Sequence, residues 1–180
     1  MPISPMLHHI RRDFMGTGTR TNPYLIDRLS QIVILKDSIN SGDPTYQNAF
    51  FKQIRDIDFS SIQNWDGIGT FQNKANINYN GNGYKIINLR SSAISGNSYA
   101  GFFSILNLNG VVRNLTIESG YITSSIPTSN FIGGICGRSY GEIYGCVNKA
   151  SVVGYSEGTV VSFAAGIAGL ASSGSSIRDC

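Results

Sequence analysis

The chain has 180 residues, 21 of them glycine, and only 14% of its residues are charged, with a formal net charge of +3. This glycine-rich, weakly charged composition is typical of a β structure with many turns, and the length suits one domain or one segment of a repeat protein. The small, scattered positive charge argues against nucleic acid or an anionic membrane as a partner, and because no apolar run reaches about 18 residues we expect no membrane-spanning helix.

Residues 1–15 form a tail with two prolines, two adjacent histidines and a pair of arginines. The tail lacks a continuous apolar stretch, so we do not expect a secretory signal peptide. One interpretation is a partly disordered leader, and the other is a docking peptide that orders against a larger assembly. The docking contacts would come from Met6, Leu7, Ile10, Arg11, Arg12 and Phe14. His8 and His9 have no third ligand nearby, so we expect no metal there.

Residues 16–79 are expected to form an N-terminal cap that contains a strand, a helix and the first coil elements. The pattern predicts a strand over Tyr24–Ile26 and a helix over Asp27–Asn40, with Asp27 as its N-cap and Gly42 near its end. The helix has one apolar face, formed by Leu29, Ile32, Leu35 and Ile39. Such a helix most simply covers the open end of a repeat core, and binding to a partner is the alternative.

A further strand is predicted over Phe50–Phe59. Asp56 and Asp58 lie two positions apart within it, and a pair of carboxylates is what cleavage of a glycosidic bond requires. We favour a structural role for this pair, because aspartates at strand ends cap turns. Trp65 and Ile68 are expected to close the hydrophobic floor near the cap, with stacking of Trp65 on a sugar as the alternative.

The second part of the chain, residues 80–180, repeats itself. A glycine followed by hydrophobic residues recurs at nearly equal intervals, at Gly101, Gly134 and Gly166. Near-constant spacing of this size is the signature of a solenoid. Short β-branched stretches separated by Gly, Ser and Asn turns fill the intervals, and no helical periodicity appears. We therefore predict an all-β fold, a right-handed parallel β-helix with one N-terminal capping α-helix.

In such a fold, equivalent residues of successive coils stack about 4.8 Å apart. The spacing predicts an inner ladder of Leu89, Leu115, Cys146 and Cys180. We interpret the cysteines as reduced, buried ladder residues and not as a disulfide framework, which fits a protein completed in a reducing cytoplasm. We also expect the coils to continue beyond Cys180, or another subunit to cover that end, because an uncapped coil exposes a pairing edge.

Five segments, in the correct order, resemble segments of GLUG-repeat β-helical surface and appendage proteins. The segments that resemble the region before such repeats are GTGTRTNPYLI, FFKQIRDIDFS and YNGNGYKIINL. The segments that resemble the repeats themselves are FIGGICGRSYGEIYGCVNKASVVG and AAGIAGLASSGSSIRDC. GGICG and AGIAG replace the more regular GGLVG, so the last coils would be divergent copies. The resemblance implies a β-helical, usually extracellular module, and it implies no reaction.

We expect a non-enzymatic structural or adhesive module, and we weigh three functional classes. The first is a phage tail fibre, spike or baseplate appendage, assembled in the host cytoplasm, docked by residues 1–15 and leading to a receptor-binding part. The alternative is a bacterial cell-surface adhesin. A carbohydrate-active enzyme is least favoured, because the 11 acidic residues are scattered and both histidines lie in the tail.

The expected partners are other virion or surface-assembly proteins, through residues 1–15, and a host-surface glycan or protein. The candidate recognition residues are three tyrosines that we expect to be exposed, Tyr121, Tyr140 and Tyr155, since aromatic side chains commonly contact sugars or proteins. Packing in the core or at its rim is the alternative for each. We expect no catalytic residue, no cofactor, no nucleic acid and no membrane insertion, and the pattern is compatible with a homo-oligomer.

Overall fold

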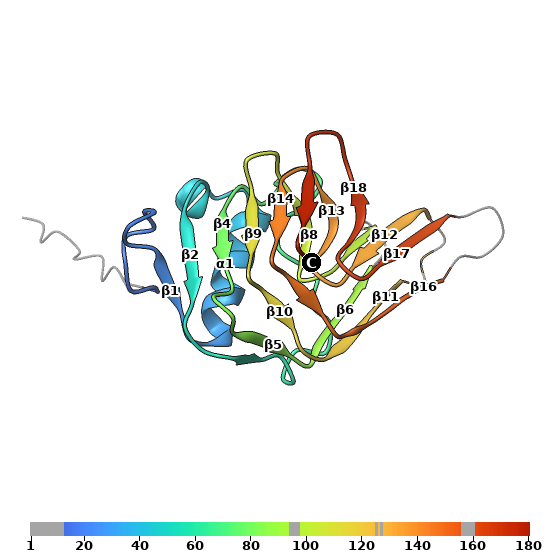
Figure 1. The fold of residues 1–180 in the computed structure, drawn as a ribbon, viewed down its shortest axis with the longest axis horizontal. Coiled ribbons are helices and arrows are strands. Elements are labelled where there is room, and N and C mark those ends of the chain that lie inside the picture. Colours follow the sequence, from blue (N-terminus) through green and yellow to red (C-terminus); the bar gives the residue numbers. More distant parts are fainter. Residues whose placement is uncertain (1–12, 94–97, 125, 127, 156–160) are drawn as a thin grey trace, which may run out of the picture.

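A computed structural model describes residues 13–93, 98–124, 126, 128–155 and 161–180. Within these residues the chain is mostly β, with one α-helix, α1 (Leu29–Ser41), and one short 3-10 turn, η1 (Pro44–Tyr46). The strands form five sheets, and the pairs between strands are parallel. Figure 1 shows successive strands of each sheet side by side along the molecule.

Each sheet takes strands from successive parts of the chain. The largest, called sheet A, orders β1 (Tyr24–Ile26), β2 (Phe50–Gln53), β4 (Asn78–Asn80), β9 (Val111–Arg113), β14 (Glu142–Tyr144) and β19 (Ser176–Arg178). The second contains β3 (Ile57–Asp58), β5 (Lys85–Ile87), β10 (Thr116–Ile117) and β15 (Val147–Asn148). The others contain β6 (Leu89–Ala93), β11 (Gly120–Ser124) and β16 (Ser151–Gly154); β7 (Tyr99–Ala100), β12 (Asn130–Gly133) and β17 (Ser162–Ala165); and β8 (Phe103–Leu106), β13 (Cys136–Ser139) and β18 (Ala168–Ala171).

The register of β8, β13 and β18 confirms the repeat read from the glycine spacing. Phe103, Cys136 and Ala168 pair across these strands, and each follows a glycine of the repeat at the same distance along the chain. The predicted ladder is wrong in one member, since Leu89 lies opposite Gly120 in β6 and β11. The reason is that the interval between Leu89 and Leu115 is shorter than the interval between Leu115 and Cys146.

The three cysteines are free, as expected, but only two of them are buried. Cys136 and Cys146 lie in the core, where burial raises the pKa of both thiols to about 12. Cys180 is exposed, so its predicted burial is wrong. It follows Arg178, which pairs with Tyr144 in the last described strand pair of sheet A, so no further described strand covers it.

The centre of the core is aromatic. Phe102 is fully buried, and its ring lies 5.2 to 6.1 Å from those of Phe59, Trp65, Tyr79 and Phe103. The Trp65 indole also donates a 2.9 Å hydrogen bond to the Phe102 carbonyl. Trp65 and Ile68 are 1% and 0% exposed, which confirms that they belong to the hydrophobic floor. Trp65 is therefore not available for stacking on a sugar.

The predicted helix is confirmed, but it begins at Leu29, slightly later than expected. Asp27 is not its N-cap, because the extended residue before the helix is Arg28 and the Asp27 carboxylate pairs with the Arg28 guanidinium at 2.8 Å. The side chain of Gln31 instead accepts a 2.8 Å hydrogen bond from the Asp27 N–H. The helix ends at Gly42, which has a positive φ of 83°, as is common at this position.

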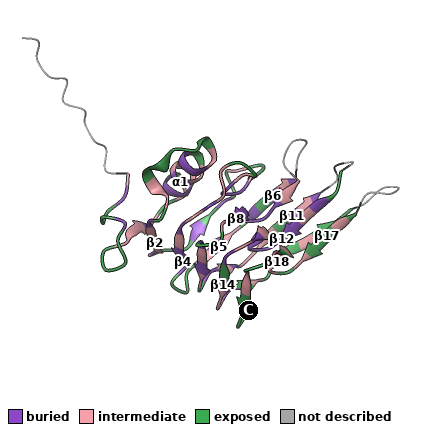
Figure 2. Ribbon diagram, turned by 90° about the horizontal axis from the view of Figure 1, so that it is seen from above, coloured by how far each residue is buried: buried purple, intermediate pink, exposed green. Residues whose placement is uncertain are grey.

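Helix α1 packs against one end of the core, as predicted for a cap. Ile32, Leu35 and Ile39 are completely buried there, and Figure 2 shows α1 at the end of the molecule away from β17 and β18. Burying these three side chains removes the apolar face of the helix from water. The apolar face is therefore occupied by the chain's own core and is not available to a partner.

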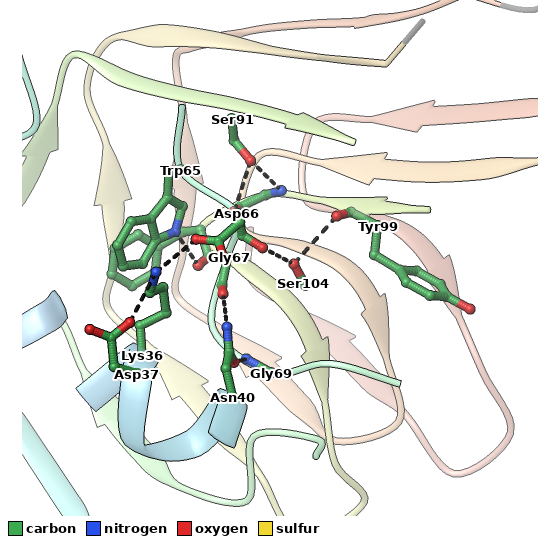
Figure 3. Close-up of polar contacts among 12 residues, drawn as sticks. Lys36, Asp37, Asn40, Trp65, Asp66, Gly67, Gly69, Ser91, Tyr99 and Ser104 are labelled. Atoms are coloured by element: carbon green, nitrogen blue, oxygen red, sulfur yellow. Dashed lines mark hydrogen bonds and ion pairs between the residues drawn. The ribbon is translucent and has the colours of Figure 1, made fainter. Parts of the chain in front are cut away.

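Polar contacts also fix α1 to the segment that follows β3 (Figure 3). Lys36 Nζ lies 2.9 Å from Asp66 Oδ1 and 3.1 Å from Asp37 Oδ1. Burial opposes the charged form of Lys36, but the hydrogen bonds to the two carboxylates outweigh it, and its pKa is raised. Asn40 donates to the Gly67 carbonyl at 3.0 Å and accepts from the Gly69 N–H at 2.7 Å. The helix is therefore held in one orientation.

The segment predicted as one strand over Phe50–Phe59 is two strands, β2 and β3, separated by residues 54–56. Phe51 of β2 and Ile57 of β3 are buried, and both belong to the same hydrophobic core as the residues of the later repeats. Residues 16–79 thus share one hydrophobic core with residues 80–180. In the part of the chain that the structure describes, no helix is both long and apolar enough to cross a membrane.

Candidate functional site

A groove of about 820 Å³ runs over the outer face of β6 and β11. Its lining is polar apart from one aromatic ring, and it consists of Ser60, Gln63, Asn64, Asn88, Arg90, Ser91, Ser92, Gly120, Tyr121 and Thr123. Amide, hydroxyl and guanidinium groups around an aromatic ring can hydrogen-bond to a polar ligand and pack against its apolar face. The groove is therefore the candidate functional site.

The outward-facing side chains of β6 and β11 form the floor of the groove. Arg90 pairs with Tyr121 and Ser92 pairs with Thr123, so these four residues share the outer face. Their neighbours Leu89 and Ile122 point the other way and are completely buried. Since successive side chains of a strand point to opposite faces, burial of one set fixes the direction of the other.

One wall of the groove comes from residues 60–64, which follow β3. This segment turns sharply, with the Ile62 N–H bonded to the Phe59 carbonyl at 2.8 Å. It returns to the sheet at Trp65, whose N–H bonds to the Arg90 carbonyl at 2.7 Å. The buried indole of Trp65 therefore anchors the wall beside the outer row of β6.

Asp58 fixes one end of the groove. Its carboxylate accepts hydrogen bonds from the Asn88 side chain at 2.9 Å and from the Ser60 N–H at 2.8 Å. The hydrogen bond from Asn88, followed by those from Ser60, lowers the pKa of Asp58. Asp56 accepts a 2.8 Å hydrogen bond from the Lys85 N–H. Asp58 therefore has the turn-stabilising role that we expected, whereas Asp56 bonds to the first residue of β5 and caps no turn of its own segment.

Acid should weaken the fold through Asp58. Its folded pKa lies below the unfolded value of about 3.9, so the carboxylate stabilises the fold above about pH 4, and this stabilisation is lost as the pH falls through the folded pKa. We expect Asp58→Asn to reduce the loss of stability between about pH 7 and about pH 3, measured by urea unfolding. The control is Asp179→Asn, because Asp179 is exposed. Equal acid dependence in the two variants would contradict this role.

The three predicted recognition tyrosines do not come together. Tyr121 is 48% exposed and lines the groove, whereas Tyr155 is 57% exposed and lies outside its lining. Tyr140 is half-buried and packs against the Arg138 guanidinium, whose central carbon is 4.7 Å from the ring centroid. Of the three, Tyr121 alone belongs to the candidate site.

The docking prediction for the tail is partly wrong. Phe14 is only 4% exposed, and its ring lies 5.2 to 5.5 Å from those of Tyr24, Tyr46 and Phe51. It belongs to the core of its own chain and is not available to a partner. The other predicted contacts, Met6, Leu7, Ile10, Arg11 and Arg12, lie outside the described residues, as do His8 and His9.

Most of the groove and a nearby stack of aromatic rings were not predicted from the sequence. Tyr99, Phe131 and Phe163 pair across β7, β12 and β17, with ring centroids 5.7 and 5.1 Å apart and nearly parallel planes. Their equal spacing along the chain was a signal that could have revealed the stack. No comparable spacing marks Gln63 and Asn64, which reach the groove from an irregular segment.

The groove offers binding groups and no carboxylate. Its lining contains no Asp, Glu, His or Cys, so the side chains there can donate and accept hydrogen bonds and contribute one positive charge from Arg90. Across the described ranges, no cluster of three such residues is suited to hold a metal ion. The chemistry that the groove supports is recognition of a polar ligand.

Comparison with known proteins links the chain to two much larger ones. It is 32% identical over 133 residues to a "Putative Gly-rich membrane protein" of Evansella cellulosilytica, covering 71% of this chain and 14% of that protein. It is 31% identical over 150 residues to "Halomucin" of Haloquadratum walsbyi, covering 78% of this chain and 2% of that protein. The chain thus spans a small part of these relatives. No family model matches it.

One solved structure shares the fold. A "putative immunoglobulin A1 protease from Bacteroides ovatus" superposes with a TM-score of 0.50 and 20% sequence identity, covering 90% of this chain and 66% of that one. At this level of identity the likeness concerns the fold alone. It supports the mostly β architecture and says nothing about the groove.

Proposed function

We propose that this chain is a non-enzymatic, β-helical attachment module that binds a glycan in the groove over β6 and β11. The winding as a right-handed parallel β-helix is part of this proposal. It is supported by the five parallel sheets, each of which takes strands from successive repeats. The hand follows the general rule for connections between parallel strands.

The observation that carries the proposal is the placement of Tyr121. Its half-exposed ring lies on a rigid strand, paired with Arg90, and the amides of Gln63, Asn64 and Asn88 line the same groove. A sugar ring has an apolar face that can pack on an aromatic ring and hydroxyl groups that bond to amides and guanidinium. Since the floor is anchored in the core, little conformational freedom would be lost on binding.

Replacement of Tyr121 by alanine should remove most of the glycan binding. We expect the affinity for a glycan selected on a glycan array to fall about tenfold or more in Tyr121→Ala, measured by calorimetry. The matched control is Tyr155→Ala, because Tyr155 is similarly exposed but lies outside the groove. Absence of any glycan ligand on the array, or equal binding by wild type and Tyr121→Ala, would contradict the proposal.

We further propose a location at the cell surface. The names of the two relatives, a membrane protein and a halomucin, support this location. Neither relative supports the virion location that we predicted from the sequence. Immunogold labelling of native material with an antibody against the repeats tests the choice, since label on a cell envelope agrees with the proposal and label on a phage tail contradicts it.

A further inference from the structure

A row of basic side chains follows the outer face of sheet A, on strands other than those that carry the groove. Lys52 of β2, Asn80 of β4 and Arg113 of β9 are paired in register, so their side chains leave the same face. Beyond Arg113 the same face continues through Tyr144 of β14 to Arg178 of β19, whose guanidinium is already paired with Glu142 at 3.4 Å. Figure 1 shows the strands β2, β4, β9 and β14 side by side.

A second hollow, of about 270 Å³, lies at the start of this row. Asn80 is short, and it stands between the two longer side chains of Lys52 and Arg113, which leaves space between them. Arg20 borders the hollow from the loop before β1, and Phe50 contributes a half-buried ring. The hollow is lined by Arg20, Thr21, Pro23, Phe50, Phe51, Lys52, Asn80 and Arg113.

The loop that carries Arg20 is fixed by backbone hydrogen bonds. The Thr17 and Thr19 N–H groups both bond to the Asn22 carbonyl, at 3.0 and 3.2 Å. The Phe50 N–H bonds to the Gly18 carbonyl at 2.9 Å, which ties the loop to β2 beside Lys52. The arrangement of the hollow is therefore built before any ligand arrives.

The cations of this hollow have no carboxylate partner. Its lining contains three positive side chains and no acidic one. Several cations elsewhere on the chain do have carboxylate partners, as Lys36, Lys85, Lys149 and Arg178 show. Within the described ranges, the Arg113 side chain has one protein partner, the Tyr144 hydroxyl at 3.3 Å, and Arg20 and Lys52 have no ion pair. An external anion would balance these charges.

We propose that the basic row, defined as Arg20, Lys52 and Arg113, binds a linear acidic polysaccharide that runs across the strands of sheet A. Lys52 and Arg113 are two strands apart, which places them on the order of 10 Å from one another. A polymer with regularly spaced anionic groups meets such a row at successive positions. One sulfate or carboxylate enters the hollow, where the forked guanidinium groups of Arg113 and Arg20 match its oxygen atoms.

A nucleic acid fits this row less well than a polysaccharide. Phosphates along a nucleic acid are closely spaced and call for a dense basic surface, and single strands call for open aromatic platforms. Here Asn80 separates Lys52 from Arg113, and beyond Arg113 the Arg178 guanidinium already covers the Tyr144 ring at 4.4 Å. The proposal is independent of the Tyr121 groove, which lies on different strands.

The test uses heparin as a sulfated probe and polygalacturonate as a carboxylated probe. We expect the double variant Lys52→Gln/Arg113→Gln to bind the preferred probe about tenfold or more weakly than wild type, measured by calorimetry. The control, Arg55→Gln/Lys74→Gln, removes the same charge outside the hollow and should bind like wild type. Binding of heparin alone assigns sulfate, and binding of polygalacturonate alone assigns carboxylate.

Three results would overturn the proposal: no binding of either probe by wild type, equal loss of binding in the double variant and the control, or tighter binding of single-stranded DNA than of both probes. A second measurement serves if the double variant fails to fold. In wild type, the bound probe should slow acetylation of Lys52 and leave Lys74 unaffected, as followed by mass spectrometry. Tyr121→Ala should bind both probes like wild type, so failure of the groove and failure of the basic row are distinguishable.

Discussion

Phe102→Ala should lower the free energy of unfolding by about 3 to 5 kcal/mol, the largest loss that we expect from a single core truncation in this chain. Phe102 is completely buried and contacts four other aromatic rings, from Phe59, Trp65, Tyr79 and Phe103. Truncation leaves a cavity that these rings cannot fill, since each is held by its own backbone. Urea unfolding at equilibrium measures the change.

The matched control for this prediction is Phe71→Ala. Phe71 is 58% exposed, and its ring contacts the Lys74 ammonium, which lies 5.3 Å from the ring centroid. Removing an exposed ring at such a site should change the free energy of unfolding by less than about 0.5 kcal/mol. If the two variants lost similar stability, the aromatic cluster would not be the centre of the core that the structure shows.

Gly69→Ala should be the second most damaging change, with an expected loss of about 2 to 5 kcal/mol. Gly69 has a positive φ of 91°, a conformation that costs alanine free energy. A Cβ at this position would also overlap with the carbonyl oxygen of Ile105, which belongs to β8 of the next layer. The strand would have to move away from the segment that holds α1 through Asn40.

Gly83→Ala separates the two causes. Gly83 has a similar φ of 81°, but a Cβ there would meet no atom within 4 Å. We therefore expect only the conformational cost, about 1 to 2 kcal/mol, in urea unfolding. Equal losses in Gly69→Ala and Gly83→Ala would show that the close approach of Ile105 to Gly69 has no energetic weight.

The repeat was the part of the fold that could be predicted best from the sequence. Gly101, Gly134 and Gly166 lie at equivalent positions because a parallel sheet places residues one repeat apart in register, so the period of the sequence reports the pairing directly. Leu89 was misplaced because its spacing from Leu115 departs from that period. Asp27 was wrongly predicted as the N-cap because aspartate is a favoured residue at that position. In the structure the Asp27 N–H donates to the Gln31 side chain, and the helix begins after Arg28.

The candidate sites were harder to predict. Tyr121 was named because exposed aromatic residues are common in recognition, but nothing in the sequence indicated that Gln63 and Asn64 would face it. These residues are far from Tyr121 in the chain and meet it only through the turn before Trp65. Similarly, a net charge of +3 gave no sign that Arg20, Lys52 and Arg113 share one hollow, because a total charge contains no information about position.

The near-constant interval between paired strands also affects how the gene for such a chain can change. Duplication of a segment from one strand to its partner one repeat later, such as residues 116–146, would add one complete layer and leave every other pair in register. Insertion of a single residue inside β11 would instead exchange the faces of the side chains that follow it, so that outward side chains would point into the core and buried ones would point out. Whole repeats are therefore the natural unit of lengthening, and point insertions are tolerated only in the turns.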